Sequence, residues 1–220
     1  MFHTDDTTVW ACLGTLISPN IVLTAAHCVH TRKPEQVLSS VGCTAPPCLI
    51  DVARVVNHES YSSLQPEQGN DIALVKLNKS LNGIEFVCLP TVSFHPSTLV
   101  NQNTFVVATN IHRKGVAWKS RNSTEHTLIE MPVMPNEECQ IIFEDHLRVH
   151  EADVCAGGQG VEPCHGDSAA PLLVYDDDRR WTLVAIVTLG SVKCGDAPYP
   201  TVYTNVGAHL RWIHETQRSI

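Results

Sequence analysis

Short hydrophobic runs rich in β-branched residues recur along the whole chain, and polar or turn-forming residues separate them. Pairs such as Asn82-Gly83 and Gly157-Gly158 mark turns between the runs. Strands at this spacing predict an antiparallel barrel or sandwich, because a parallel sheet needs helical segments between its strands. The expected strands are residues 37–41, 49–56, 72–77, 105–108, 172–175, 181–189 and 201–203.

Convincing helical periodicity occurs near the C-terminus. Val206, Leu210 and Ile213 follow the spacing of one helix face, and Asn205 stands where an N-cap is expected. Length alone permits one all-β domain or two small domains. Because no repeat, low-complexity tract or Pro/Gly-rich linker divides the chain, we expect residues 1–220 to form one domain.

A second helix is expected between Cys139 and Cys155. His146 and His150 have the spacing of two metal ligands on one helix face. No third ligand accompanies them, so we interpret this segment as a surface helix and expect no metal. The sequence predicts no cofactor either.

Charge and hydropathy exclude two classes of partner. Lys and Arg number 15 against 23 Asp and Glu, which gives a formal net charge of −8, and no basic run offsets it. A nucleic-acid partner is therefore not expected. The apolar runs fall far short of the roughly 18 residues that cross a bilayer, so we expect no membrane span.

Nine cysteines are scattered over the 220 residues rather than paired at zinc-ligand spacing. This pattern is typical of disulfides in a secreted, extracellular protein, and the odd cysteine needs a partner outside this chain. The acceptor sequons at Asn78 and Asn122 also favour secretion and glycosylation. Residues 1–6 do not form a signal peptide, so we expect the chain to begin partway through a longer protein.

Three local patterns bring together residues suited to nucleophilic catalysis. His27 ends an apolar run in T-A-A-H-C, Asp71 begins another in D-I-A-L, and Ser168 lies among small residues in H-G-D-S-A-A-P. A serine hydroxyl needs an imidazole to take its proton, and a buried carboxylate orients that imidazole. The amides of Gly166 and Ser168 can both point at one oxyanion.

These motifs resemble those of the chymotrypsin-like (trypsin-like) serine protease family. The order His27, Asp71, Ser168 matches the family, and the resemblance extends from about Cys12 to Ile213. It implies an all-β fold of two antiparallel six-stranded-type barrels with a short C-terminal α-helix. The family's first strand has no counterpart in this sequence, so we expect the domain to be incomplete at its N-terminus.

The resemblance also implies a pairing for the cysteines. Cys88 resembles the cysteine that joins the catalytic chain to an N-terminal light chain or clip domain. Cys43 and Cys48, which are close in the sequence, resemble a bridge of arthropod clip-domain proteases. This resemblance suggests an arthropod immune or developmental protease. The implied bridges are Cys12–Cys28, Cys43–Cys48, Cys139–Cys155 and Cys164–Cys194.

Several positions depart from the family pattern. In active members the amine of a newly cleaved N-terminus pairs with the acid at Asp167, so we expect that carboxylate to be a buried charge without its cation here. Ala169 and Ala170 replace glycines, which costs roughly 1–2 kcal/mol wherever a positive φ is required. The usual G-W-G is replaced by the segment at 109–111, near the region that rearranges on activation.

The implied specificity pocket is unusual as well. Glu162 stands where trypsin-like members place an aspartate, which favours Arg or Lys in the substrate. Thr201 replaces a glycine on the pocket wall and shortens the pocket. Thr188 and Gly190 lie on the strand that pairs with the substrate backbone.

The resulting hypothesis is a secreted serine endopeptidase that cleaves after Arg or Lys in an extracellular cascade. Its expected partners are protein substrates, zymogens among them, and protease inhibitors. The alternative is a non-catalytic protease homologue that binds active proteases, which the replaced glycines and narrowed pocket favour. A third alternative is a defective gene model.

Overall fold

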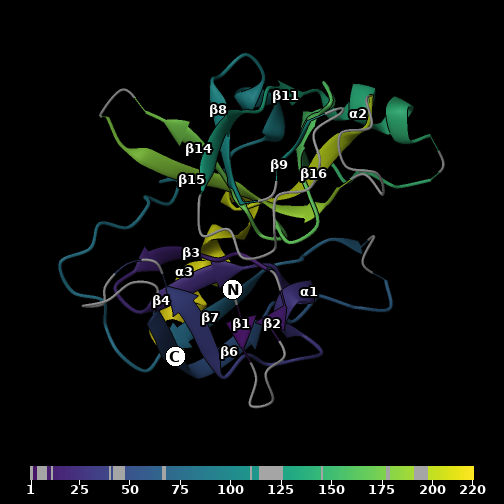
Figure 1. Cartoon of the computed structure of the whole chain (residues 1–220). Coiled ribbons are helices and arrows are strands. Elements are labelled where there is room, and N and C mark those ends of the chain that lie inside the picture. Colours follow the sequence, from purple (N-terminus) through teal and green to yellow (C-terminus); the bar gives the residue numbers. More distant parts are fainter. Residues whose placement is uncertain are drawn as a thin grey trace.

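The computed structural model describes residues 2–3, 9–10, 12–39, 41, 48–65, 68–109, 111–113, 126–144, 146–176, 179–190 and 198–220. These residues form two curled antiparallel sheets stacked one above the other, the first from the N-terminal half and the second from the C-terminal half (Figure 1). The predicted all-β, chymotrypsin-like class is confirmed. Each sheet contains seven strands, where six were expected.

The N-terminal sheet has the strand order β2-β1-β5-β6-β7-β4-β3. Two-residue strands β1 and β2 lie at one edge, and the long strand β6 joins the two curled parts. Its strands are β1 (Phe2–His3), β2 (Val9–Trp10), β3 (Thr15–Ser18), β4 (Ile21–Thr24), β5 (Gln36–Ser39), β6 (Cys48–Asn57) and β7 (Ala73–Leu77).

The C-terminal sheet has the order β10-β8-β14-β15-β16-β12-β11, and β13 pairs with β9 in a separate two-stranded sheet. Every residue of the neighbouring strands β12 and β16 is buried, and β16 carries Thr201. The strands are β8 (Thr104–Ala108), β9 (Ile111–Arg113), β10 (Thr127–Glu130), β11 (Val133–Met134), β12 (Val154–Gly157), β13 (Val161–Pro163), β14 (Pro171–Tyr175), β15 (Trp181–Leu189) and β16 (Pro200–Asn205).

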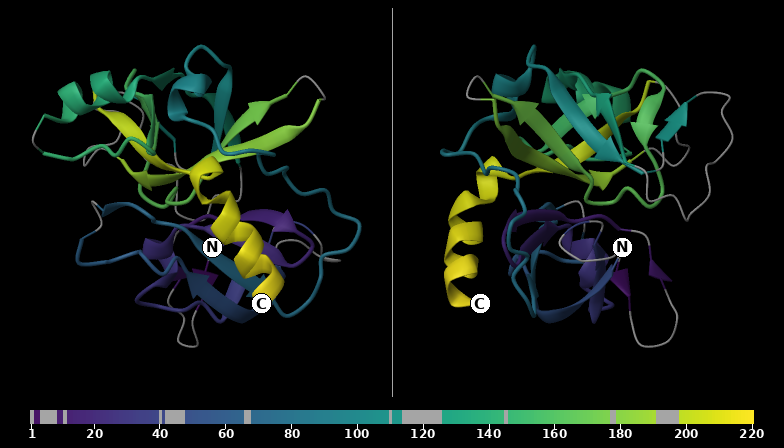
Figure 2. Two further views of the ribbon diagram at one scale, coloured as in Figure 1. Left: turned by 180° about the vertical axis from the view of Figure 1, so that it is seen from behind. Right: turned by 60° about the vertical axis from the view of Figure 1, so that its left-hand side comes forward.

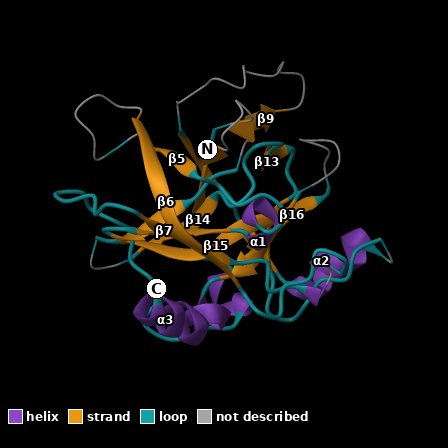
Figure 3. Cartoon of the chain, turned by 90° about the horizontal axis from the view of Figure 1, so that it is seen from below, coloured by secondary structure: helices purple, strands orange, loops and turns teal. Residues whose placement is uncertain are grey.

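The helical elements are short and lie mostly at the periphery (Figure 3). The surface helix expected between the two cysteines is wrongly placed: α2 begins before Cys139, and the described residues from 146 to 150 are not helical. The elements are α1 (Ala26–Val29), η2 (Pro96–Leu99), α2 (Asn136–Phe143), η3 (Gly207–His209) and α3 (Leu210–Ser219).

The C-terminal helix connects the two halves. β16 belongs to the C-terminal sheet, but α3 lies against the N-terminal half (Figure 2). Val206 and Ile213 are buried in the N-terminal core together with strands β4 and β7. Asn205 caps the η3 turn by accepting from the Ala208 amide at 3.3 Å, while α3 itself begins after His209 without a side-chain cap. No described helix is long and apolar enough to cross a membrane.

Candidate active site

The candidate base and acid meet because β4 and β7 are paired neighbours. Thr24, at the end of β4, lies opposite Ala73 at the start of β7. His27 follows β4 on the single turn of α1, and Asp71 comes just before β7. This places them side by side although they are 44 residues apart in the chain.

Two hydrogen bonds join His27 to the Asp71 carboxylate. The His27 amide donates to Oδ1 at 2.7 Å, and His27 Nδ1 lies 2.6 Å from Oδ2. Asp71 is 3% exposed, whereas the His27 side chain is 33% exposed. Because a carboxylate only accepts, Nδ1 carries a proton and Nε2 is left as the basic nitrogen. This is the tautomer that a general base requires.

Polar groups from both halves of the chain lie near Asp71. Burial and the nearby charge of Asp71 raise the pKa of the Tyr61 hydroxyl to about 12. The Thr204 hydroxyl lies 3.3 Å from the Asp71 carbonyl oxygen and 2.6 Å from the hydroxyl of Thr188. Thr188, expected on the substrate-binding strand, therefore also belongs to the polar network behind the acid.

Ser168 is tied to the histidine segment through Leu13. The Leu13 amide donates to the Ser168 carbonyl at 2.8 Å, and the Thr24 hydroxyl donates to the Leu13 carbonyl at 2.8 Å. The Cys12–Cys28 disulfide fixes Leu13's neighbour to the residue after His27. Sequence analysis missed both linking residues, since nothing in their local sequence marks them.

The serine and histidine side chains are not hydrogen-bonded in the described part of the chain. His27 Nε2 instead lies 3.5 Å from Cys28 Sγ, a disulfide sulfur that has no proton to donate. Hydrogen bonds of catalytic groups are often long without substrate. The structure thus brings His27 and Asp71 into contact and holds the backbone of Ser168 near them.

The turn before Ser168 carries the two amides that the sequence predicts as oxyanion donors. Gly166 has φ 99°, and the Asp167 amide donates to the Cys164 carbonyl at 2.8 Å. The amides of Gly166 and Ser168 donate to no acceptor among the described residues. Both proposed donors therefore remain available to a substrate oxygen.

Asp167 is fully buried, and its carboxylate accepts hydrogen bonds from two segments. The amide and hydroxyl of Thr109 donate to Oδ1 at 2.7 and 2.8 Å, and the Cys164 amide donates to Oδ2 at 3.1 Å. Neutral donors therefore hold the buried carboxylate, while the expected lack of its cation stays a prediction. Threonine, in the segment replacing G-W-G, adds one hydroxyl donor that glycine lacks.

The residues expected to form the specificity pocket are deeply buried. Glu162 on β13 and Thr201 on β16 have no exposed surface, and Gly190 is exposed beyond β15. Burial, followed by the nearby charges of Glu162 and Asp167, raises the pKa of Tyr203 far above its usual value. The charges of both carboxylates thus act on one buried tyrosine of the C-terminal sheet.

Two of the four expected disulfides are present as predicted, Cys12–Cys28 and Cys139–Cys155. Cys48 and Cys164 are disulfide-bonded too, but their expected partners at positions 43 and 194 lie outside the described residues. Cys88 is a free, half-buried cysteine.

One group of metal-ligand types occurs among the described residues. It consists of Cys12, His27 and Cys28, whose donor atoms lie within 4.8 Å of one another. Both sulfurs belong to the disulfide and are not thiolates, so we assign no metal to this group.

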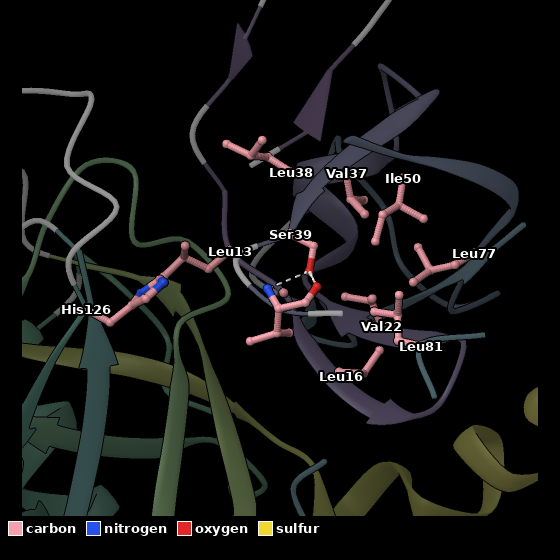
Figure 4. Close-up of a pocket in the computed structure, with 12 residues that line it drawn as sticks. Leu13, Leu16, Val22, Val37, Leu38, Ser39, Ile50, Leu77, Leu81 and His126 are labelled. Carbon is pink, nitrogen blue, oxygen red and sulfur yellow. Dashed lines mark hydrogen bonds between the residues drawn. The ribbon is translucent and has the colours of Figure 1, made fainter. Parts of the chain in front are cut away.

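A separate cavity of about 190 Å³ opens inside the N-terminal half (Figure 4). Leu16, Val22, Ile50 and Leu77 make it largely apolar, and Ser39 and His126 are its polar lining residues. No member of the expected triad lines it. Leu13, which links Ser168 to the segment of His27, is one of its lining residues.

Replacing Thr109 tests its bond to the buried carboxylate. Thr109→Val keeps the shape and the amide but removes the hydroxyl donor, so the free energy of unfolding should fall by about 1–3 kcal/mol. Thr109→Ser retains the hydroxyl and should lose less than about 1 kcal/mol. Urea unfolding of both variants gives the comparison, and equal losses would show that the hydroxyl contributes nothing.

The two alanines after Ser168 form a matched pair. Both are fully buried, but Ala169 has φ 63° whereas Ala170 is not among the residues with positive φ. Ala169→Gly and Ala170→Gly delete the same methyl group, and the first also relieves left-handed strain. We expect Ala169→Gly to be more stable than Ala170→Gly by about 1–2 kcal/mol in urea unfolding. Indistinguishable variants would contradict the strain at Ala169.

Comparison with known proteins identifies the family of this chain. Residues 2–213 match the family model described as Trypsin. The chain is 31% identical over 230 residues to CLIP domain-containing serine protease HP8 of Bombyx mori, covering 92% of this chain and 60% of that protein. It is 30% identical over 239 residues to Melanization protease 1 of Drosophila melanogaster, covering 94% of this chain and 58% of that protein. It thus spans about six-tenths of the length of these relatives, and it belongs to the trypsin family of serine proteases.

Proposed function

We propose that this protein is a serine endopeptidase that hydrolyses peptide bonds through His27, Asp71 and Ser168. The observation that carries the proposal is the His27–Asp71 pair, joined at 2.6 Å with the acid buried and the imidazole open to solvent. A base held in this tautomer serves proton transfer from a neighbouring hydroxyl. The tethered Ser168 is the nucleophile that this base serves.

The reaction proceeds through an acyl-enzyme. Ser168 Oγ attacks the peptide carbonyl while His27 Nε2 takes its proton, and the amides of Gly166 and Ser168 bind the oxyanion. His27 then donates that proton to the leaving amine. In the second half a water loses its proton to His27 and attacks the ester carbonyl. His27 then returns that proton to Ser168 Oγ as the ester C–O bond breaks, which releases the acid product and regenerates the serine. Asp71 stabilises the imidazolium at each step.

Cleavage follows Arg or Lys in this proposal. Glu162 places a carboxylate with no exposed surface in the C-terminal core, and a carboxylate is the group that a substrate Arg or Lys pairs with. Thr201, equally buried, narrows the space above it. Thr188 and Gly190 at the end of β15 border the substrate backbone.

The physiological setting follows from the relatives and the cysteines. Relatives named for a CLIP domain are longer than this chain, which supports an N-terminal light chain or clip domain attached through Cys88. The proposal places the protein outside the cell, as a glycoprotein made as a zymogen and activated by cleavage. Its substrates are proteins of an extracellular cascade, zymogens among them, and protease inhibitors act on it.

A non-catalytic binding homologue is the second candidate. The observation that favours it is His27 Nε2, which lies against Cys28 Sγ with no hydrogen bond to Ser168 among the described residues. Ala169, directly after the proposed nucleophile, has a strained positive φ, which also favours a non-catalytic role.

Covalent labelling separates the two candidates. The full-length, secreted and activated protein is treated with a fluorophosphonate probe, with Ser168→Ala as the control, and the modified peptide is identified by mass spectrometry. We expect a phosphonate on Ser168 alone, because the probe needs both an activated serine and an oxyanion hole. Absence of label, while a known protease in the same tube is labelled, would favour the binding homologue.

The same preparation tests specificity. Peptide substrates with Arg or Lys before the scissile bond should be cleaved at least about 100-fold faster than peptides with Leu there. Glu162→Gln should remove most of this preference while leaving Ser168 open to the probe. An unchanged preference in Glu162→Gln would overturn the role of Glu162 without affecting the triad.

A further inference from the structure

Asp71 lies in a tight turn whose shape depends on the residue before it. Asn70 has φ 58°, a left-handed conformation that asparagine tolerates better than most residues. The Ile72 amide donates to the Asn70 carbonyl at 2.8 Å, so the chain folds sharply around Asp71. The conformation of Asn70 therefore sets the direction in which the Asp71 side chain leaves the backbone.

His209 holds the side chain of Asn70 from the other half of the chain. Its Nε2 lies 3.2 Å from Asn70 Oδ1, and its Nδ1 lies 2.8 Å from the Asn205 carbonyl oxygen. His209 ends η3 at the base of the C-terminal helix, 139 residues from Asn70. A carbonyl only accepts, so Nδ1 carries a proton. Nε2 then meets the carboxamide, which offers its amino group to a neutral ring and its oxygen to a protonated one.

A cluster of rings fixes His209 and the strand that follows Asp71. His58 packs edge-to-face on His209 with 5.3 Å between ring centroids and lies 5.0 Å from Trp212. The His58 amide donates to the Ile72 carbonyl at 3.0 Å. The residues on both sides of Asp71 are thus anchored to this one cluster.

Burial lowers the pKa of both histidines, and the nearby His58 lowers that of His209 further. The negative charge of Glu59 raises the pKa of His58, but the effect of burial is larger. These lowered pKa values leave both rings mainly neutral near pH 7. Nε2 of His209 is then an acceptor, so the Asn70 carboxamide turns its amino group rather than Oδ1 toward it. The cluster therefore works through packing and hydrogen bonds rather than through charge.

We propose that His209 is a positioning residue for Asp71, holding Asn70 in the conformation that aims the acid at His27. The inference rests on the proposed function in that the positioned acid is the one that orients the base. The hydrogen bond between His27 and Asp71 is nevertheless measurable without turnover, which keeps the two claims separable.

The test compares His209→Phe with His58→Phe in the full-length, activated protein. His209→Phe keeps an aromatic ring but loses both hydrogen bonds, whereas His58→Phe keeps a ring in the same cluster and leaves the Asn70 contact intact. The readout is the low-field NMR signal of the proton between His27 Nδ1 and Asp71 Oδ2. In His209→Phe we expect that signal to move upfield and kcat to fall about 10-fold at unchanged KM. His58→Phe should change kcat less than about 2-fold.

Asn70→Gly provides a second route, even if His209→Phe does not fold. Glycine adopts the left-handed conformation but has no carboxamide for His209 to hold. We expect the same upfield shift as in His209→Phe. Adding His209→Phe to Asn70→Gly should then lower kcat by less than about 2-fold more, because both changes break one contact.

The outcomes are distinct. An unchanged signal and kcat in folded His209→Phe would overturn the inference, and so would losses that simply multiply in the double variant. Absence of the low-field signal from the folded wild type would overturn it too. A wild type that takes no phosphonate on Ser168, but whose signal moves in His209→Phe, would contradict the proposed function and support the positioning role.

Discussion

The carboxylate of Asp71 is almost fully buried, and the arrangement of the residues that contact it follows from that constraint. A buried acid is costly unless donors surround it, and here both oxygens accept from His27, one through the backbone and one through the ring. The same two bonds fix the tautomer and orientation of the imidazole. The same contacts therefore stabilise the buried acid and orient the base. They depend on β4 and β7 being paired in the correct register.

The same constraint governs the second buried acid of the site. Asp167 lies between the two amides proposed to bind the oxyanion, and its carboxylate is held by donors from Thr109 and Cys164. Fixing this side chain also fixes the turn that carries Ser168. Thr109 thus supplies two of the neutral donors that hold the carboxylate which the family pattern pairs with an N-terminal amine.

Much of the fold and the candidate triad could be predicted from sequence because their signals are local. The strand runs, the C-terminal helix and the motifs around His27, Asp71 and Ser168 each occupy a few consecutive residues. Thr109 and Leu13 act through partners far away in the sequence, and no local pattern indicates those contacts. The sequence could predict strain at Ala169 only if its φ were positive, and the sign of that φ depends on how the turn packs. Helix α2 was misplaced because the spacing of His146 and His150 resembles a helix face by chance.

A crystal structure of the activated protein after reaction with a small fluorophosphonate would test most directly whether the prepared base serves Ser168. The account predicts a phosphonate on Ser168 Oγ, with one phosphoryl oxygen accepting from the amides of Gly166 and Ser168. It also predicts His27 Nε2 within about 3 Å of the serine or phosphonate oxygen. An unmodified Ser168, with Nε2 still against Cys28 Sγ, would contradict the assignment of this protein as a protease and favour a binding role.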